Sequence, residues 1–105
     1  MLDAARRELL EETGYEAQHV VELAAGPTSA GLSAERVTIV HATGLRKRSA
    51  GGGTAAEAIR VHEVPLAEVD RWLAQRVAQG VLIDVKIYVG LYLVSKARDR
   101  SVPAR

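Results

Sequence analysis

A chain of 105 residues has room for one small domain, and a hydrophobic content of 48% indicates a folded chain and not a disordered one. The absence of cysteine excludes disulfides and thiolate metal sites, and it agrees with a cytoplasmic location. A net charge of +1 gives no general argument for nucleic acid as a partner. Charges close to Met1 argue against a signal peptide, and the longest apolar stretch, residues 81–94, is interrupted by Asp84 and Lys86, so we expect no contact with a membrane.

The first predicted element is a helix over residues 2–13. Gly14 follows it and fits the left-handed position that closes a helix. Leu2, Ala5 and Leu9 recur at helical spacing, so this face of the helix can pack against a sheet.

Three carboxylates project from another face of this helix. They stand at i, i+3 and i+4, as Glu8, Glu11 and Glu12. Like charges on adjacent turns repel, and a plain solvated helix would usually interleave lysines among them. Oxygen ligands grouped in this way suit Mg²⁺ or Mn²⁺, which offset the repulsion and can organise a pyrophosphate. The alternative is an exposed amphipathic helix whose charged face is simply solvated.

Two strands are predicted next in the chain. Residues 16–25 favour the first strand, and the turn-rich residues 26–33 favour a loop. Residues 36–43 are rich in β-branched side chains and alternate, which predicts the second strand. The alternation places Val37 and Ile39 on one face and Thr38, Val40 and Ala42 on the other.

The following stretch, residues 45–56, contains Arg46-Lys47-Arg48 and Gly51-Gly52-Gly53. We expect a long mobile loop here, with the basic triplet solvated. Residues 59–64 alternate again and predict a third strand.

Two helices are predicted in the last third of the chain. Pro65 opens the first of them, which should stop at Gly80. Asp84 is the expected N-cap of the second, which is apolar on more than one side as far as Val94 and should therefore be well buried. The basic tail after Ser95 is expected to fray.

This order of elements predicts an α+β fold, in the form of an α/β/α sandwich around a small sheet. We assign residues 1–96 to a single domain and residues 97–105 to a flexible basic tail. His19, His41 and His62 lack the spacing of metal ligands, and Trp72 lies on an amphipathic helix, where a core position is expected.

Residues 7–15, Arg-Glu-Leu-Leu-Glu-Glu-Thr-Gly-Tyr, resemble the second half of the Nudix box, the signature helix of the Nudix hydrolases. The pattern of that family is Gly-x5-Glu-x7-Arg-Glu-U-x-Glu-Glu-x-Gly-U, where U is a bulky apolar residue. The chain matches the second half at every defined position, with Tyr15 the loosest fit. The leading Gly and first Glu of the pattern would fall before Met1, so we expect a partial Nudix fold without its opening strands, with a small mixed sheet flanked by helices. The resemblance extends from Leu2 to about Lys96.

The resemblance implies a Mg²⁺- or Mn²⁺-dependent hydrolase of the ADP-ribose pyrophosphatase type. Such an enzyme cleaves a nucleoside diphosphate linked to another group, such as ADP-ribose or a nucleotide sugar, into two monophosphates, and is commonly a homodimer. It implies that Glu8 and Glu12 are metal ligands, with Glu11 supporting them in metal binding and catalysis. Residues 57–62 resemble the segment in which a loop glutamate is the general base, which assigns that role to Glu57. The alternative for Glu57 is an ordinary exposed loop position.

Two further residues are candidates for substrate binding. Residues 26–36 partly resemble a Ser-Pro-Gly loop of the family that ends in a Glu near the substrate, which suggests this role for Glu35. Arg6 could bind phosphate or orient a carboxylate of the acidic helix.

Two alternatives to hydrolysis stay open. The first is a Nudix-like domain that binds a nucleotide or a protein without cleaving anything. The second is a basic nucleic-acid-binding module, which would depend on Arg46-Lys47-Arg48 alone and lacks interleaved aromatic residues.

Overall fold

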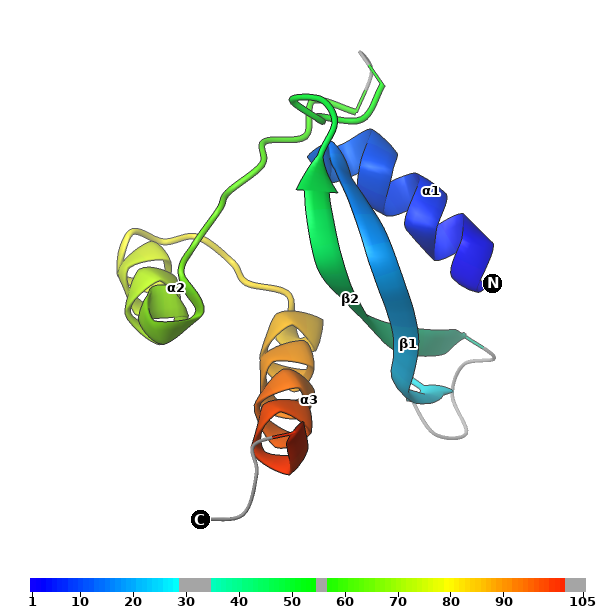
Figure 1. Cartoon of the computed structure of the whole chain (residues 1–105). Coiled ribbons are helices and arrows are strands. Elements are labelled where there is room, and N and C mark those ends of the chain that lie inside the picture. Colours follow the sequence, from blue (N-terminus) through cyan, green and yellow to red (C-terminus); the bar gives the residue numbers. More distant parts are fainter. Residues whose placement is uncertain (29–34, 55–56, 102–105) are drawn as a thin grey trace. The chain divides into compact units, whose positions relative to one another are not determined.

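The computed structural model of the chain describes residues 1–28, 35–54 and 57–101 (Figure 1). These residues divide into two compact units, Met1–Val61 and His62–Arg105. They form a mixed α+β structure with three α-helices, one short 3₁₀ helix and one antiparallel sheet of two strands. The predicted class is confirmed, although the described sheet is antiparallel and not mixed. The assignment of residues 1–96 to one domain and 97–105 to a tail stays a prediction.

The first unit opens with helix α1, which spans Leu2–Thr13 as predicted. Gly14 ends it in the left-handed conformation, with φ +80°, and the Gly14 N–H donates to the Leu10 carbonyl oxygen at 2.8 Å. The Thr13 hydroxyl strengthens this end, because it donates to the Leu9 carbonyl at 2.6 Å and accepts from the Tyr15 N–H at 3.2 Å. The chain therefore leaves the helix in a fixed direction and enters the sheet at once.

Strands β1 (Tyr15–Pro27) and β2 (Arg36–Lys47) pair antiparallel, from Tyr15 opposite Lys47 to Pro27 opposite Arg36. Both are longer than predicted, because backbone pairing continues where the apolar alternation has stopped. Residues 46 and 47 belong to β2 and not to a solvated loop. Lys47 Nζ lies 5.8 Å from the centre of the Tyr15 ring. The predicted loop over residues 26–33 lies largely outside the described residues.

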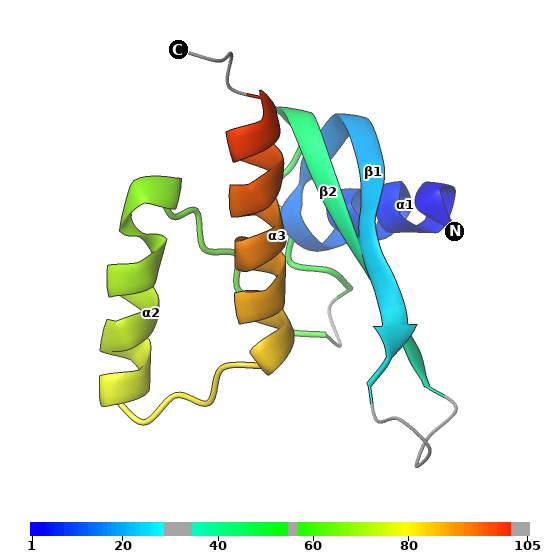
Figure 2. The same cartoon turned by 90° about the horizontal axis from the view of Figure 1, so that it is seen from below.

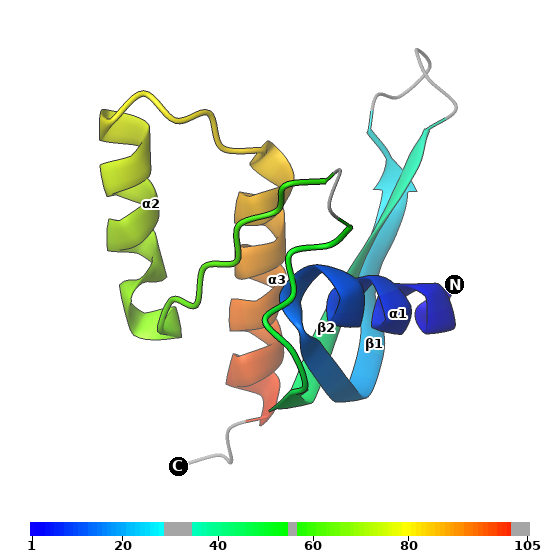
Figure 3. The ribbon, with the colours of Figure 1, turned by 90° about the horizontal axis from the view of Figure 1, so that it is seen from above.

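Helix α1 lies against one face of this hairpin and crosses the strands (Figure 2, Figure 3). Ala17 and Val20 of β1 are the buried apolar residues among those described in this unit. Arg6 joins the two layers, because its Nη1 donates to the Ala17 carbonyl oxygen at 2.7 Å. The packing of α1 on the hairpin therefore depends on a hydrogen bond as well as on apolar contact.

The predicted third strand is not formed, since residues 59–64 belong to no strand or helix. An alternating pattern creates a strand only where another strand supplies hydrogen-bond partners. The Ile59 N–H instead donates to the Gly52 carbonyl at 3.3 Å, which is a loop contact. The boundary between the two units follows, at Val61 and His62.

The second unit contains a 3₁₀ turn, η1 (Leu66–Glu68), and helices α2 (Val69–Ala78) and α3 (Val85–Ser101). The two α-helices run in opposite directions (Figure 2). Pro65 directly precedes η1, as predicted for the start of this helical segment. Gly80, with φ +86°, follows the end of α2. Leu73 is the core residue of α2, with 4% of its surface exposed.

Trp72, for which a core position was expected, is only half-buried. Its ring lies 5.1 Å from that of His62 and 5.2 Å from the Arg76 guanidinium carbon. Trp72 therefore contacts other side chains of this unit but is not part of its buried core.

Helix α3 begins as predicted but is neither well buried nor frayed after Ser95. Asp84 caps it, because the Lys86 N–H donates to Asp84 Oδ1 at 2.9 Å. Val85 is 72% exposed and Tyr92 is 60% exposed, so apolar character on several sides did not produce burial. The helix continues to Ser101, beyond the end at Ser95 that the sequence predicted. Residues 102–105 of the predicted tail lie outside the described part.

In the parts of the chain that the structure describes, no helix combines the length and the apolar character needed to cross a membrane.

The cap of α3 should make its stability depend on pH. The side-chain hydrogen bond from Lys86 lowers the pKa of the Asp84 carboxyl below its ordinary 3.8, and the hydrogen bond from the Lys86 backbone adds to this. A carboxylate whose pKa is lowered by folding stabilises the fold above its unfolded pKa, and this contribution is lost as the pH falls through the folded pKa. We therefore expect the stability contributed by Asp84 to persist at neutral pH and to be lost below about pH 4.

The matched variant is Asp84→Asn, which keeps an oxygen acceptor at the cap but cannot titrate. Thermal unfolding followed by circular dichroism should show wild type losing stability relative to Asp84→Asn below about pH 4. Two parallel pH profiles would show that the cap does not contribute in solution.

Candidate functional site

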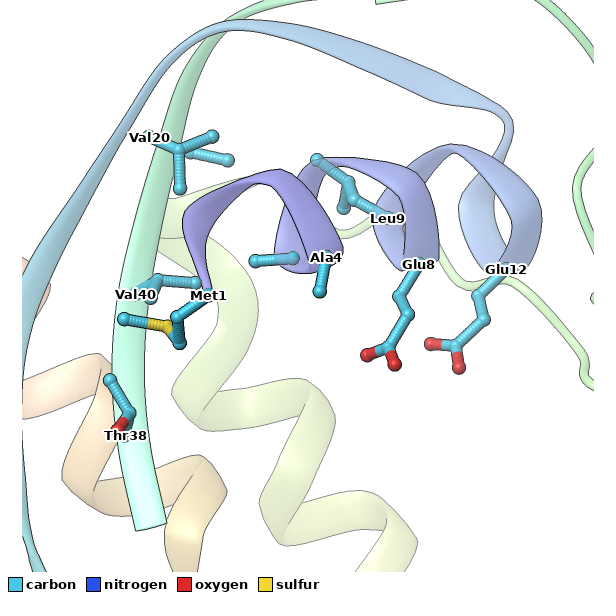
Figure 4. Close-up of a pocket in the computed structure, with 10 residues that line it drawn as sticks. Met1, Ala4, Glu8, Leu9, Glu12, Val20, Thr38 and Val40 are labelled. Atoms are coloured by element: carbon cyan, nitrogen blue, oxygen red, sulfur yellow. The ribbon is translucent and has the colours of Figure 1, made fainter.

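An open pocket of about 450 Å³ lies between α1 and the hairpin (Figure 4). Its volume is within the range of about 300–1,000 Å³ that is usual for small-molecule sites. Acidic, small and apolar side chains from three elements line it: Met1, Ala4, Ala5, Glu8, Leu9, Glu12, Val20, Thr38, Val40 and Ala42.

Two of the three glutamates predicted as metal ligands lie together at one end of this pocket. Glu8 and Glu12 come from successive turns of α1, and their carboxylates point to the same side of the helix (Figure 4). Glu8 is exposed and Glu12 is half-buried. Within the described residues, no hydrogen bond or ion pair engages either carboxylate. The two groups can therefore accept a cation without breaking an existing interaction.

Apolar side chains line the other end of the pocket. Val20 of β1, Val40 of β2 and Met1 lie there, and Leu9 of α1 lies between Val20 and the two glutamates (Figure 4). Thr38, Val40 and Ala42 line it from alternate positions of β2, which confirms the shared face predicted for them. Sequence reasoning grouped these three residues without connecting them to the acidic helix. Alternation along β2 predicts which residues share a face of the strand. It does not predict which helix that face packs against.

Glu11, the third predicted carboxylate, is exposed and does not line the pocket. Its backbone carbonyl nevertheless accepts a hydrogen bond from the Gly53 N–H at 2.9 Å, and the Glu12 carbonyl accepts from the Gly52 N–H at 2.7 Å. The stretch predicted as a free, mobile loop is therefore bound along part of its length to the last turn of α1. The glycine content of this stretch did not predict its mobility correctly, because glycine allows close approach of backbones as well as flexibility.

This contact brings the segment that carries Glu57 to the acidic helix. Glu57 is exposed, and its Oε1 accepts from the Thr54 N–H at 2.8 Å, while its own N–H donates to the Thr54 carbonyl at 3.0 Å. The Thr-x-x-Glu spacing is the one that allows a glutamate side chain to bond back to a threonine backbone N–H, as it does at helix N-termini. Ala58 follows with φ +52°, a strained value for a residue other than glycine.

The two predicted substrate-binding residues do not reach the pocket. Glu35 is exposed and precedes β2 at the Pro27–Arg36 end of the hairpin, where its backbone carbonyl accepts from the Thr28 N–H at 3.4 Å. The guanidinium of Arg6 is occupied by the Ala17 carbonyl. Their roles in substrate binding stay predictions.

The carboxylates of Glu8 and Glu12 fit a hard divalent cation that takes only some of its ligands from the protein. Among the described residues, no three acidic or histidine side chains come together as a metal site. Mg²⁺ usually binds through one or two carboxylates and completes its shell with water and substrate phosphate. Glu8 and Glu12 supply such a pair.

No protein-family model matches the chain, and no curated protein matches it either, so these comparisons do not identify it as a Nudix hydrolase.

We expect Mn²⁺ to bind at the acidic end of the pocket, with Glu12 as one of its ligands. Glu12→Gln should weaken binding about tenfold or more, because it removes one of two neighbouring anionic oxygen donors. Isothermal titration with Mn²⁺ measures this affinity directly. Glu22→Gln is the matched control, since Glu22 is an exposed glutamate on β1 outside the pocket. Equal affinities in wild type and Glu12→Gln would place the metal elsewhere.

Proposed function

We propose that this chain is a Nudix-type hydrolase that uses Mg²⁺ or Mn²⁺ to cleave the pyrophosphate of ADP-ribose or a nucleotide sugar. One observation carries the proposal. The Arg-Glu-x-x-Glu-Glu-x-Gly pattern folds as a helix that Gly14 closes, and it directs Glu8 and Glu12 to one end of a pocket of ligand size (Figure 4).

In this proposal the acidic residues have distinct roles. Glu8 and Glu12 would hold the cation, and Glu11 would add negative potential beside them. A divalent cation bound there would supply positive charge that neutralises the phosphate and orients the attacking water. Glu57 takes the proton from that water as its oxygen bonds to phosphorus, and the bridging oxygen leaves with the second monophosphate.

The finer description of the fold belongs to the same proposal. Helix α1 on one face of the β1–β2 hairpin supplies one helical layer and part of a sheet, which is compatible with an α/β/α sandwich of Nudix type (Figure 3). The homodimer implied by the resemblance is likewise part of the proposal, and sedimentation velocity tests it.

A second candidate is a Nudix-like domain that binds a nucleotide without cleaving it. The observation that favours it is the hydrogen bond between Glu57 Oε1 and the Thr54 N–H, which occupies one oxygen of the proposed base. A binding domain needs the pocket and the two carboxylates but no base.

Incubation with ADP-ribose and Mg²⁺ separates these two candidates. We expect two monophosphates, detected by chromatography, and we expect their formation to stop when Mg²⁺ is chelated or when Glu8 and Glu12 are both changed to glutamine. Glu22→Gln should retain the activity. Calorimetric binding of ADP-ribose without turnover would support the binding domain, and neither binding nor turnover would refute both.

The role of Glu57 is tested by Glu57→Gln. If Glu57 is the base, kcat should fall by roughly 10²–10⁴-fold, whereas KM should change little, because the substitution removes proton transfer and not substrate contact. An unchanged kcat would return Glu57 to its purely local role beside Thr54.

A further inference from the structure

Gly51, in the glycine segment of residues 51–53, approaches α1 so closely that a side chain could not fit there. A Cβ on Gly51 would lie 2.7 Å from the Glu12 carbonyl oxygen and closer still to the Thr13 backbone. On the facing side, a Cβ on Gly14 would overlap the Ser49 carbonyl. Gly14 and Gly51 also have positive φ angles of +80° and +72°. Both positions therefore require glycine for space as well as for backbone conformation.

Hydrogen bonds run from this segment and the residues before it into the end of α1. The N–H groups of Arg48 and Ser49 donate to the Gly14 carbonyl at 2.7 and 3.2 Å. Gly52 and Gly53 donate to the carbonyls of Glu12 and Glu11. Carbonyls in the last turn of a helix lack partners within the helix, so residues 48–53 supply donors that the helix itself cannot.

The same segment holds Glu57. A Cβ on Gly53 would lie 2.9 Å from Glu57 Oε1, so this carboxylate packs directly against the glycine backbone. The Thr54 N–H, next in the chain, donates to the same oxygen. Contacts thus connect the last turn of α1 with Gly53 and then with the Glu57 carboxylate.

We propose that Gly51 is a positioning residue. Its missing side chain lets the glycine segment bond to α1, and these bonds hold the Glu57 carboxylate beside the last turn of that helix. The inference rests on the proposed function for the catalytic role of Glu57, but the coupling itself is testable without activity. The strained φ of Ala58 fits a segment that its contacts hold in place.

Gly51→Ala tests the coupling through amide hydrogen exchange and NMR of the whole chain. In wild type the Gly52 and Gly53 amides should be protected, because both donate to α1. In Gly51→Ala they should exchange about tenfold faster or more, and the signals of the Thr54 amide and the Glu57 carboxylate should shift, while amides within α1 stay protected. Gly53→Ala provides a second variant, because its Cβ would meet the side chains of Ile59 and Glu57 and no helix backbone. It should shift the Glu57 carboxylate and leave the Gly52 amide protected.

Two glycines provide matched controls. A Cβ on Gly80 would meet nothing within 4 Å, although its φ is +86°, so Gly80→Ala introduces backbone strain without a clash. Gly26 has open space and no positive φ. Neither control should change the exchange of the Gly52 and Gly53 amides.

Kinetics distinguishes positioning from a general structural role. Gly51→Ala should lower kcat with KM nearly unchanged, and it should have no further effect in a Glu57→Gln background, because it acts through that carboxylate. A loss of equal size in both backgrounds would overturn the proposal. So would unprotected Gly52 and Gly53 amides in wild type, or an unshifted Glu57 carboxylate in Gly51→Ala. Protected amides and the expected shifts in a chain without turnover would support the coupling and refute only the proposed hydrolysis.

Discussion

The carbonyl groups at the end of α1 are the point on which the first unit depends. A helix leaves its last carbonyls without internal partners, and here backbone N–H groups of residues 48–53 bond to those of Glu11, Glu12 and Gly14. The chain enters β1 at Tyr15 and leaves β2 at Lys47, so both ends of the hairpin meet at this site. Helix, sheet and glycine segment are thereby joined by backbone groups, which side-chain substitutions elsewhere do not remove.

The same end of the helix has unfavourable electrostatics. Glu11 and Glu12 stand in the last turn, where the helix dipole is negative, and no basic residue of that turn balances them. N–H donors from the glycine segment place partial positive charge at the carbonyls, but the carboxylates themselves stay uncompensated within the described residues. A bound divalent cation would lower this cost, so the proposed metal site and the stability of α1 are linked.

The parts of this structure that sequence predicted well are those determined by neighbours in the chain. Helix α1 and its stop at Gly14, the two paired strands, and the cap at Asp84 all follow from local spacing and residue type. The identity of Glu8 and Glu12 as neighbours on one face needed only helical periodicity.

The predictions that were wrong have a common cause, because each of those features depends on residues that are distant in the sequence. Residues 59–64 alternate like a strand but have no strand beside them, and α3 is apolar without being enclosed. The glycine segment looked free because nothing in its own sequence records the carbonyls that it contacts about 40 residues earlier. The pocket was missed for the same reason, since its apolar end is formed by strand residues distant from the acidic helix.

That long separation has a consequence for the order of folding. Helix α1 is made of local contacts, which form early. The pairs of the β1–β2 hairpin are 9 residues apart in sequence at Pro27 and Arg36 and 32 apart at Tyr15 and Lys47, whereas the bonds from Gly52 and Gly53 to Glu12 and Glu11 close loops of about 40 residues. We expect the ends of these loops to come together after the hairpin has brought Lys47 beside Tyr15. Contacts made late in folding chiefly govern how fast a protein unfolds. The hydrogen bonds of the glycine segment are therefore expected to slow unfolding of a helix and hairpin that have already assembled.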